Sequence, residues 1–161
     1  MLTAIKRTLL ENERKMKQLL LTLFIICLFS SAGFSQLKYG QKRIIFGKDV
    51  RVNLRGIKDT TYPRFTPYFD DIDSTDTFLN KNFNPDFNFS GKILLFENYY
   101  RQYFGVLING KRCIYIKGFC NESECFMQSY CDYMGGGTCY FRILIEIDTK
   151  KILLSYFNAP K

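Results

Sequence analysis

The sequence contains no histidine and no tryptophan among its 161 residues. Histidine is the commonest general base, the commonest metal ligand and the side chain that titrates near neutral pH. Its absence excludes a Ser–His–Asp triad and a Cys–His nucleophile within this chain. Charged residues make up only 24% of the chain and hydrophobic residues 47%, a composition typical of a chain that folds around a core.

A dense basic block is also missing, although the formal net charge is +8. Lysine and arginine are scattered along the chain, and no recognised RNA-binding motif accompanies them. Such a charge supports at most weak attraction to anionic surfaces. We therefore expect no nucleic-acid partner.

A long hydrophobic run is lacking as well. The apolar stretch Leu19–Phe29 is shorter than the about 20 residues that a membrane span requires. Lys17 precedes this stretch and small residues follow it, which is the pattern of a secretory signal peptide. We expect cleavage after Ser35, no stable membrane span after cleavage, and a secreted, periplasmic or outer-envelope location. The alternative is a membrane-tethered protein that retains segment 19–35.

Residues 1–15 form a charged preamble that is unusual before a signal peptide. The pair Met16-Lys17 is a better start, so we expect translation to begin at Met16. The chain is thus divided into an N-terminal extension plus signal over residues 1–35 and one domain over residues 36–161.

Five cysteines follow the expected signal: Cys113, Cys120, Cys125, Cys131 and Cys139. An oxidising compartment favours disulfides, and an odd number leaves one thiol unpaired. The polar segment 120–139 lacks periodicity and is most in need of cross-links. We predict two bridges among its four cysteines, with the connectivity open, and an unpaired Cys113 in a strand. The spacings lack the two-residue knuckle of a structural zinc site, so we expect no metal and no other cofactor.

The first half of the domain predicts two short strands and one helix. Ile44–Phe46 is apolar, and alternation over residues 50–54 predicts a half-buried or edge strand. Thr66-Pro67 is a good N-cap followed by a good first helical residue, so a helix is expected over residues 67–81. Its buried face is expected to carry Phe69, Ile72, Leu79 and Phe83. Segment 92–97 is compatible with a strand or a helix.

The second half predicts an antiparallel meander. Tyr99–Ile108 alternates in polarity, and Asn109-Gly110 is the strongest short hairpin signal. The return strands are expected at Lys111–Phe119, Cys139–Asp148 and Ile152–Phe157. In the strand Cys139–Asp148, Arg142, Glu146 and Asp148 alternate with apolar residues and are expected to face water.

These elements predict an α+β fold: one helix packed on a curved antiparallel sheet of about four strands, preceded by short N-terminal strands. Cystatin-like and NTF2-like proteins share this layout. The analogy concerns architecture and implies no activity.

The segments YYRQYFGVLINGKRCIYIKGFC (99–120) and GGGTCYFRILIEIDTKKILLSYFNAP (135–160) carry a resemblance. Together with a Thr-Pro-capped helix before the Arg-Gln-Tyr strand, they resemble small exported bacterial proteins of unknown function, over about residues 63–160. The resemblance implies secretion and this order of elements. It brings no catalytic residues.

Two further motifs can each be interpreted either as a ligand-binding site or as a structural feature. Four carboxylates, Asp70, Asp71, Asp73 and Asp76, lie close together, but the turn glycine and terminal glutamate of a calcium loop are absent. We interpret them as a helix-dipole complement on a solvated face. Gly135-Gly136-Gly137 lacks the following lysine and helix of a phosphate loop, so a turn is expected.

Tyrosines surround one arginine at the start of the predicted meander. This group could form a stacking platform for a nucleotide or sugar, although tyrosine is also a good strand residue. The candidate binding residues are Tyr99, Tyr100, Arg101 and Tyr103.

No reaction centre is evident in the sequence. We expect a non-catalytic binding or envelope-associated module, with an envelope protein or a polysaccharide as the partner. An exposed patch of tyrosine and phenylalanine would support this. The alternative is a histidine-free hydrolase or thiol enzyme, which requires two close carboxylates in a pocket or an exposed cysteine of low pKa.

Overall fold

The computed structural model describes residues 15–18, 36–38, 42–57, 61–83 and 94–158. The chain forms two compact units, Met1–Phe34 and Ser35–Lys161, and the fold below is that of the second. Residues 15–18 are helical, whereas the rest of the predicted signal segment and its cleavage site lie outside the described residues. Within the described residues, no helix is long and apolar enough to cross a membrane.

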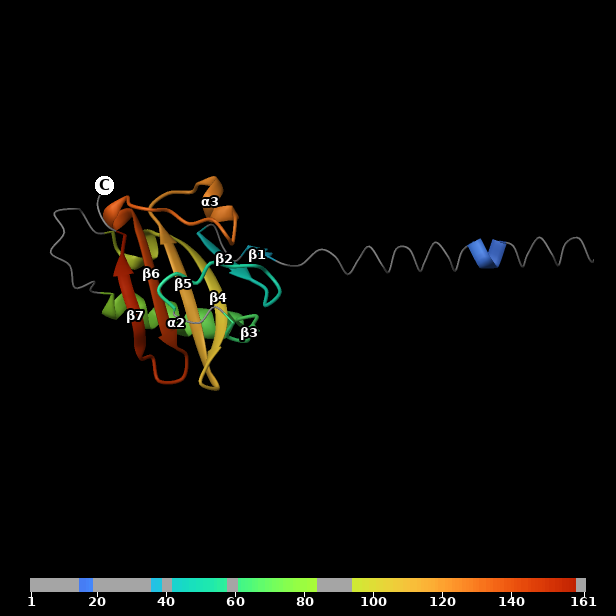
Figure 1. The fold of residues 1–161 in the computed structure, drawn as a ribbon, viewed down its shortest axis with the longest axis horizontal. Helices are drawn as coiled ribbons and strands as arrows, with labels where there is room; N and C mark the ends of the chain where they lie inside the picture. The colour runs from blue at the N-terminus through green and yellow to red at the C-terminus, as the bar shows by residue number, and fades with distance from the viewer. Residues whose placement is uncertain (1–14, 19–35, 39–41, 58–60, 84–93, 159–161) are drawn as a thin grey trace, which may run out of the picture. The chain divides into compact units, whose positions relative to one another are not determined.

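One mixed β-sheet forms the centre of the second unit (Figure 1). Its strands are β1 (Gln36–Lys38), β2 (Arg43–Phe46), β3 (Arg64–Phe65), β4 (Tyr100–Ile108), β5 (Lys111–Phe119), β6 (Tyr140–Glu146) and β7 (Ile152–Phe157). In the described part of the chain the order is β1-β2-β4-β5-β6-β7, and β3 also pairs with β4. The predicted α+β class and the meander β4–β7 are confirmed. The sheet is larger than predicted because β1, β2 and β3 join it.

The hairpin between β4 and β5 confirms the Asn109-Gly110 signal. Asn109 has φ 51° and Gly110 has φ 76°, which are the positive values that a two-residue type I′ turn requires at both central positions. Ile108 therefore pairs with Lys111, and this register continues to Tyr100 and Phe119.

One edge of β4 pairs with two different strands, one after the other along its length. β2 runs parallel to β4 and pairs with its residues 101–104. β3 runs antiparallel and pairs with Gly105 and Val106. The strand predicted over residues 50–54 is not formed, because this segment is irregular chain. Its alternation instead reflects packing: Leu54 is buried, and Val50 and Val52 pack against the same apolar cluster.

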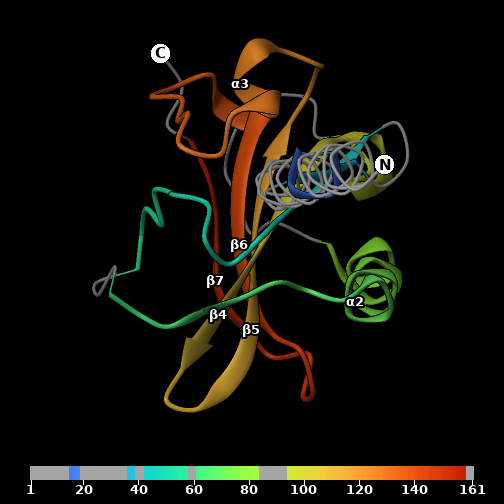
Figure 2. The same cartoon turned by 90° about the vertical axis from the view of Figure 1, so that its right-hand side faces the viewer.

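Helix α2 (Phe69–Asn82) covers one face of the sheet (Figure 2). Its residues Ile72 and Leu79 are fully buried, as predicted from their spacing. Phe83 follows the helix and packs against the same cluster, with its ring 5.1 Å from that of Phe141. Phe69 was expected on the buried face but is 42% exposed.

The start of α2 differs from the prediction. The helix begins at Phe69, its N-cap is Tyr68, and no side chain caps it. Thr66 was expected to be that cap, but its Oγ1 accepts a hydrogen bond from the backbone nitrogen of Lys48 at 3.1 Å instead. Thr66 thus connects the loop after β2 to the segment after β3.

The opposite face of the sheet is also covered. The irregular segment 47–57 and the cysteine-rich segment 120–139 pack on it; the latter contains α3 (Glu124–Met127) and the short 3₁₀ helix η2 (Gly137–Cys139). Arg142 and Glu146 were expected to face water, but they are only 3% and 5% exposed. Both faces of β6 are therefore buried, whereas β7 at the edge of the sheet is largely exposed. Segment 92–97, left open between strand and helix, ends in the 3₁₀ helix η1 (Phe96–Asn98), while residues 92–93 lie outside the described ranges.

The cysteines divide as predicted. Cys120 pairs with Cys139 and Cys125 with Cys131 at disulfide distance, with Cα atoms 4.7 Å and 5.1 Å apart. Cys113 is unpaired and fully buried in β5. Both bridges thus lie within segment 120–139, named the cysteine loop below.

Candidate functional site

A groove opens where the chain leaves the edge of β4. β2 ends opposite Phe104 and β3 ends opposite the next residue, Gly105. From these neighbouring points, segment 47–57 continues onto the face opposite α2, whereas Thr66 leads to the helix. Chain segments that leave adjacent strand ends toward opposite faces of the sheet leave a crevice between them.

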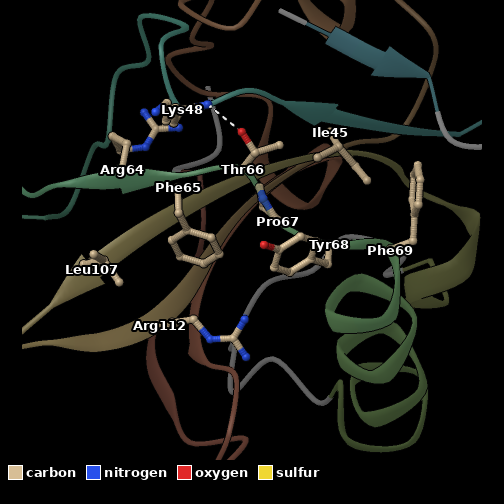
Figure 3. A pocket seen from close by; sticks show the side chains of 10 residues that line it. All are labelled: Ile45, Lys48, Arg64, Phe65, Thr66, Pro67, Tyr68, Phe69, Leu107 and Arg112. Carbon is tan, nitrogen blue, oxygen red and sulfur yellow. Dashed lines mark hydrogen bonds between the residues drawn. The ribbon is translucent and has the colours of Figure 1, made fainter.

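The groove has a volume of about 750 Å³, within the range of small-molecule sites. Figure 3 shows its walls, which come from the ends of β2 and β3, the segment leading into α2, and the β4–β5 hairpin. The lining residues are Ile45, Lys48, Arg64, Phe65, Thr66, Pro67, Tyr68, Phe69, Leu107 and Arg112. The lining is thus mostly apolar and aromatic, with three cationic side chains.

A glycine in β4 shapes the floor of the groove. A Cβ atom on Gly105 would lie 2.9 Å from the ring of Phe65 and would also collide with the backbone oxygen of that residue. Real Cβ atoms do not approach so closely, so only glycine allows β3 to lay this ring across β4. The position of Phe65 in the groove therefore depends on Gly105.

Two aromatic residues on the rim are exposed. Tyr68 is 71% exposed and the neighbouring Phe69 is 42% exposed. Large apolar side chains that remain accessible beside a concave surface are typical of a binding site. Pro67, which is buried, fixes the chain direction immediately before them.

The three cations in the groove differ in their partners. Arg112 lies 3.0 Å from Asp71 and 3.6 Å from Asp148, so carboxylates on both sides balance its charge. Lys48 and Arg64 form no ion pair with a carboxylate in the described part of the chain. Among the described residues, the positive charges of Lys48 and Arg64 in the groove therefore have no carboxylate partner.

Arg64 is the more constrained of these two cations. Its Nε donates to the backbone oxygen of Gly105 at 2.7 Å, and its Cζ lies 5.7 Å from the ring centre of Phe104. Its Nη2 is buried and has no hydrogen-bond partner among the described residues. Burial lowers the pKa of Arg64 below its usual value, because the charged form loses hydration that no carboxylate replaces. A buried donor without an acceptor is uncommon in proteins.

The described lining of the groove differs from what the enzyme hypothesis requires. The lining residues that the structure describes include no carboxylate and no cysteine, whereas hydrolysis needs paired carboxylates or an exposed thiolate. The free thiol of Cys113 is buried, and desolvation, with Glu146 nearby, raises its pKa. A thiol of raised pKa is a poor nucleophile. The arrangement of the groove is suited to binding.

The predicted stacking platform is not formed. Tyr99 and Tyr103 are fully buried and Arg101 is 6% exposed, so their ring and guanidinium faces are packed against the core. Tyr100 is half-buried, with its ring 5.2 Å from that of Phe126. The prediction failed because alternation in a strand does not tell which face a later segment will cover.

The acidic cluster is split between two environments. Asp70 and Asp71 lie in the first turn of α2, as expected for a helix-dipole complement. Asp76, expected on a solvated face, is buried: it accepts a hydrogen bond from Tyr103 at 2.8 Å and lies 3.2 Å from Arg101. Within the described ranges, no group of three or more Cys, Asp or Glu residues is placed to hold a metal ion.

Gly135-Gly136-Gly137 forms the expected turn, with positive φ at all three residues. It ends at η2 and lies in the cysteine loop, away from the residues that line the groove. Nothing in its surroundings resembles a phosphate loop, which needs a helix of normal length after the glycines.

The groove residues were not identified from the sequence. The available signal was the string YPRFTPYF (62–69), which is dense in aromatic residues and proline and lies between two regular elements. Such a segment cannot be assigned to a helix or strand by periodicity, so its clustering of ring side chains was the only indication. Comparison of the chain with protein-family models, with curated proteins and with solved structures finds no match.

Proposed function

We propose that this protein is an exported, non-catalytic binding module that holds a small molecule with an apolar body in the groove beside β4. The observation that carries this proposal is the combination of a volume of about 750 Å³ with a wall of ring and aliphatic side chains. Two of these rings remain accessible in the folded protein. The binding free energy would come mainly from removing apolar surface from water.

Two observations support a location outside the cytosol. Four of the five cysteines after residue 35 are paired at disulfide distance, and such pairs persist mainly in oxidising compartments. The apolar stretch 19–29 with its preceding lysine has the pattern of an export signal. An export system would thus deliver the domain to the envelope or the medium, where it meets its ligand.

Calorimetric titration with 1-decanol tests the proposal. This probe has an apolar body and no charge, so it reports on the apolar wall alone. We expect saturable binding by the purified protein with its disulfides intact. The variant Tyr68→Ala removes an exposed part of the wall and should weaken binding about threefold to tenfold, because most of one ring contact is lost.

Tyr130→Ala is the matched control. Tyr130 is 64% exposed but lies in the cysteine loop, away from the groove lining. Its removal should leave the affinity for 1-decanol unchanged. Absence of saturable binding, or equal losses in the two variants, would overturn the proposed function.

A further inference from the structure

Charge complementarity within the groove extends the proposal to a class of ligand. We infer that the ligand is a single-chain amphiphile with a carboxylate head, which binds with its head at Lys48 and Arg64 and its chain along the aromatic wall. This inference rests on the proposed function and concerns the same groove. It names the free molecule as occupant and not a lipid in a bilayer.

The two cations that have no carboxylate partner among the described residues belong to neighbouring chain segments. Both line the groove, and the backbone of Lys48 is hydrogen-bonded to Thr66, two residues after Arg64. Figure 3 shows the two side chains together at the upper left of the groove, whereas Arg112 approaches from below. One position near this pair would therefore experience both positive charges.

Arg64 supplies a positive charge of fixed position here. Its Nε donates to the backbone oxygen of Gly105 at 2.7 Å, and its Cζ lies 5.7 Å from the ring centre of Phe104. The guanidinium plane is thus fixed before a ligand arrives, which reduces the entropy lost on binding. A carboxylate drawn to this charge can bond to the exposed Lys48 by a charge-assisted hydrogen bond, about twice as strong as a neutral one.

The walls of the groove beyond Lys48 and Arg64 indicate the chemistry of the other end of the ligand. Phe65, Pro67 and Tyr68 extend from the cationic pair toward the start of α2, and this side carries no uncompensated charge because Asp71 balances Arg112. A hydrocarbon or aryl chain fits these surfaces, whereas a second anionic group would find no unpaired cation there. The chemistry therefore favours one anionic head and one apolar tail.

Titrations with matched probes test the ligand class. Decanoate, 1-decanol and decyltrimethylammonium share a ten-carbon chain and differ in the charge of the head, and acetate carries the head without the chain. We expect decanoate to bind at least tenfold more tightly than 1-decanol, which corresponds to one charge-assisted hydrogen bond. Decyltrimethylammonium and acetate should bind more weakly than 1-decanol.

Variants locate the head of the ligand. Lys48→Gln and Arg64→Gln should each remove most of the advantage of decanoate over 1-decanol while leaving the affinity for 1-decanol within about twofold. Lys151→Gln removes one exposed charge in the turn before β7, outside the groove, and should change neither affinity. Because Arg64 also contacts Gly105, Lys48→Gln is the variant that keeps the test valid if Arg64→Gln folds poorly.

The outcomes separate the two proposals. Equal affinities for decanoate and 1-decanol would overturn the carboxylate inference and leave the binding module standing. No binding of any ten-carbon probe would overturn both. Tight association with phosphatidylglycerol vesicles, without saturable binding of free decanoate, would also overturn this inference, because the occupant would then be a membrane surface.

Discussion

The two faces of the sheet are covered by chain of opposite character. On one face lies α2, whose backbone groups bond within the helix, and the contact is mainly apolar, apart from the buried ion pair of Asp76 with Arg101. On the other face lies the cysteine loop, where regular structure is limited to short helical turns. The backbone carbonyl groups of the cysteine loop therefore need hydrogen-bond donors from outside the loop, since buried backbone groups must be paired.

A row of donor side chains on the sheet provides these partners. Gln102 pairs with Lys117 in the strand register, and Lys117 pairs with Arg142. Together they form a line across β4, β5 and β6, named the donor row here. Gln102 lies 2.6 Å from the backbone oxygen of Phe126, and the Nζ of Lys117 donates to those of Ser129 and Cys131 at 3.1 Å.

Arg142 completes the donor row. Its guanidinium bonds Asp132 in the cysteine loop and Asn158 after β7. Asn158 in turn donates to the backbone oxygens of Tyr133 and Gly135. The comparison shows that a helix can be packed through apolar contacts, whereas an irregular loop needs polar donors from the sheet and covalent cross-links.

Substitution of Arg142 is expected to lower the free energy of unfolding most. Arg142→Met should lower the free energy of unfolding by about 3 to 5 kcal/mol, because it leaves a carboxylate without its buried counter-charge. Arg43 contacts Asp73 at 2.8 Å and the buried Asp76 at 3.4 Å on the helix face, but it is partly exposed, and Asp76 keeps Arg101 as a second partner. Arg43→Met should therefore cost only about 1 kcal/mol. Denaturant unfolding measures both, and equal costs would remove the distinction between the faces.

Removal of the disulfides should have the next largest effect. The double variant Cys120→Ser, Cys139→Ser opens a loop with a sequence separation of 19, and should cost about 3 kcal/mol. Cys125→Ser, Cys131→Ser opens a separation of 6, for which the same relation gives about 2 kcal/mol. In hydrogen exchange, amides of the cysteine loop should lose protection before those of α2. Simultaneous loss would show that the two faces unfold as one unit.

Lys117 should produce a dependence of stability on pH. Burial lowers its pKa to about 8 in the folded protein, with Asp132 opposing this shift and Arg142 adding to it. The unfolded chain, with the usual pKa of 10.5, then binds more protons at this residue between pH 8 and 10.5. Stability contributed by this residue should rise with pH in that window, by about 2 kcal/mol from pH 8 to pH 10.

The variant Lys117→Met isolates the contribution of this residue from that of every other titratable group. The unfolding free energy of the natural protein minus that of the variant should increase as the pH is raised from 8 to 10. A difference that is independent of pH would mean that the pKa of Lys117 is not lowered in the folded state.

The smallest expected effect on stability lies in the groove. Lys48 is exposed and forms no ion pair within the described residues, so Lys48→Gln should change the free energy of unfolding by less than about 0.5 kcal/mol. Thermal unfolding without ligand checks this value. A larger loss would indicate that Lys48 stabilises the fold, and its effect on ligand binding could then not be ascribed to the groove.

The sequence allowed the local features of the fold to be predicted. The Asn109-Gly110 turn and the strands on either side follow from periodicity and from turn chemistry, which act between near neighbours. The parallel pairing of β2 with β4 joins residues nearly sixty positions apart, and no local pattern records it. Arg142 was expected to face water because arginine usually does, but its partners come from Asp132 and Asn158, which a single strand pattern does not reveal.

The groove was harder to predict than the core for the same reason. It arises where two strand ends meet on β4, so Lys48 and Arg64 become neighbours only through tertiary structure. The disulfide cysteines could be assigned as a set because compartment and segment composition restrict them. Their connectivity depends on which backbone positions approach each other, and spacing alone does not determine it.

Two-dimensional NMR of the isotope-labelled protein titrated with decanoate tests the central claim most directly. The binding account predicts saturable shifts in the resonances of Lys48, residues 64–69 and Leu107, while those of the cysteine loop and the donor row stay in place. Shifts confined to residues 120–139, or no saturable shifts at all, would contradict it.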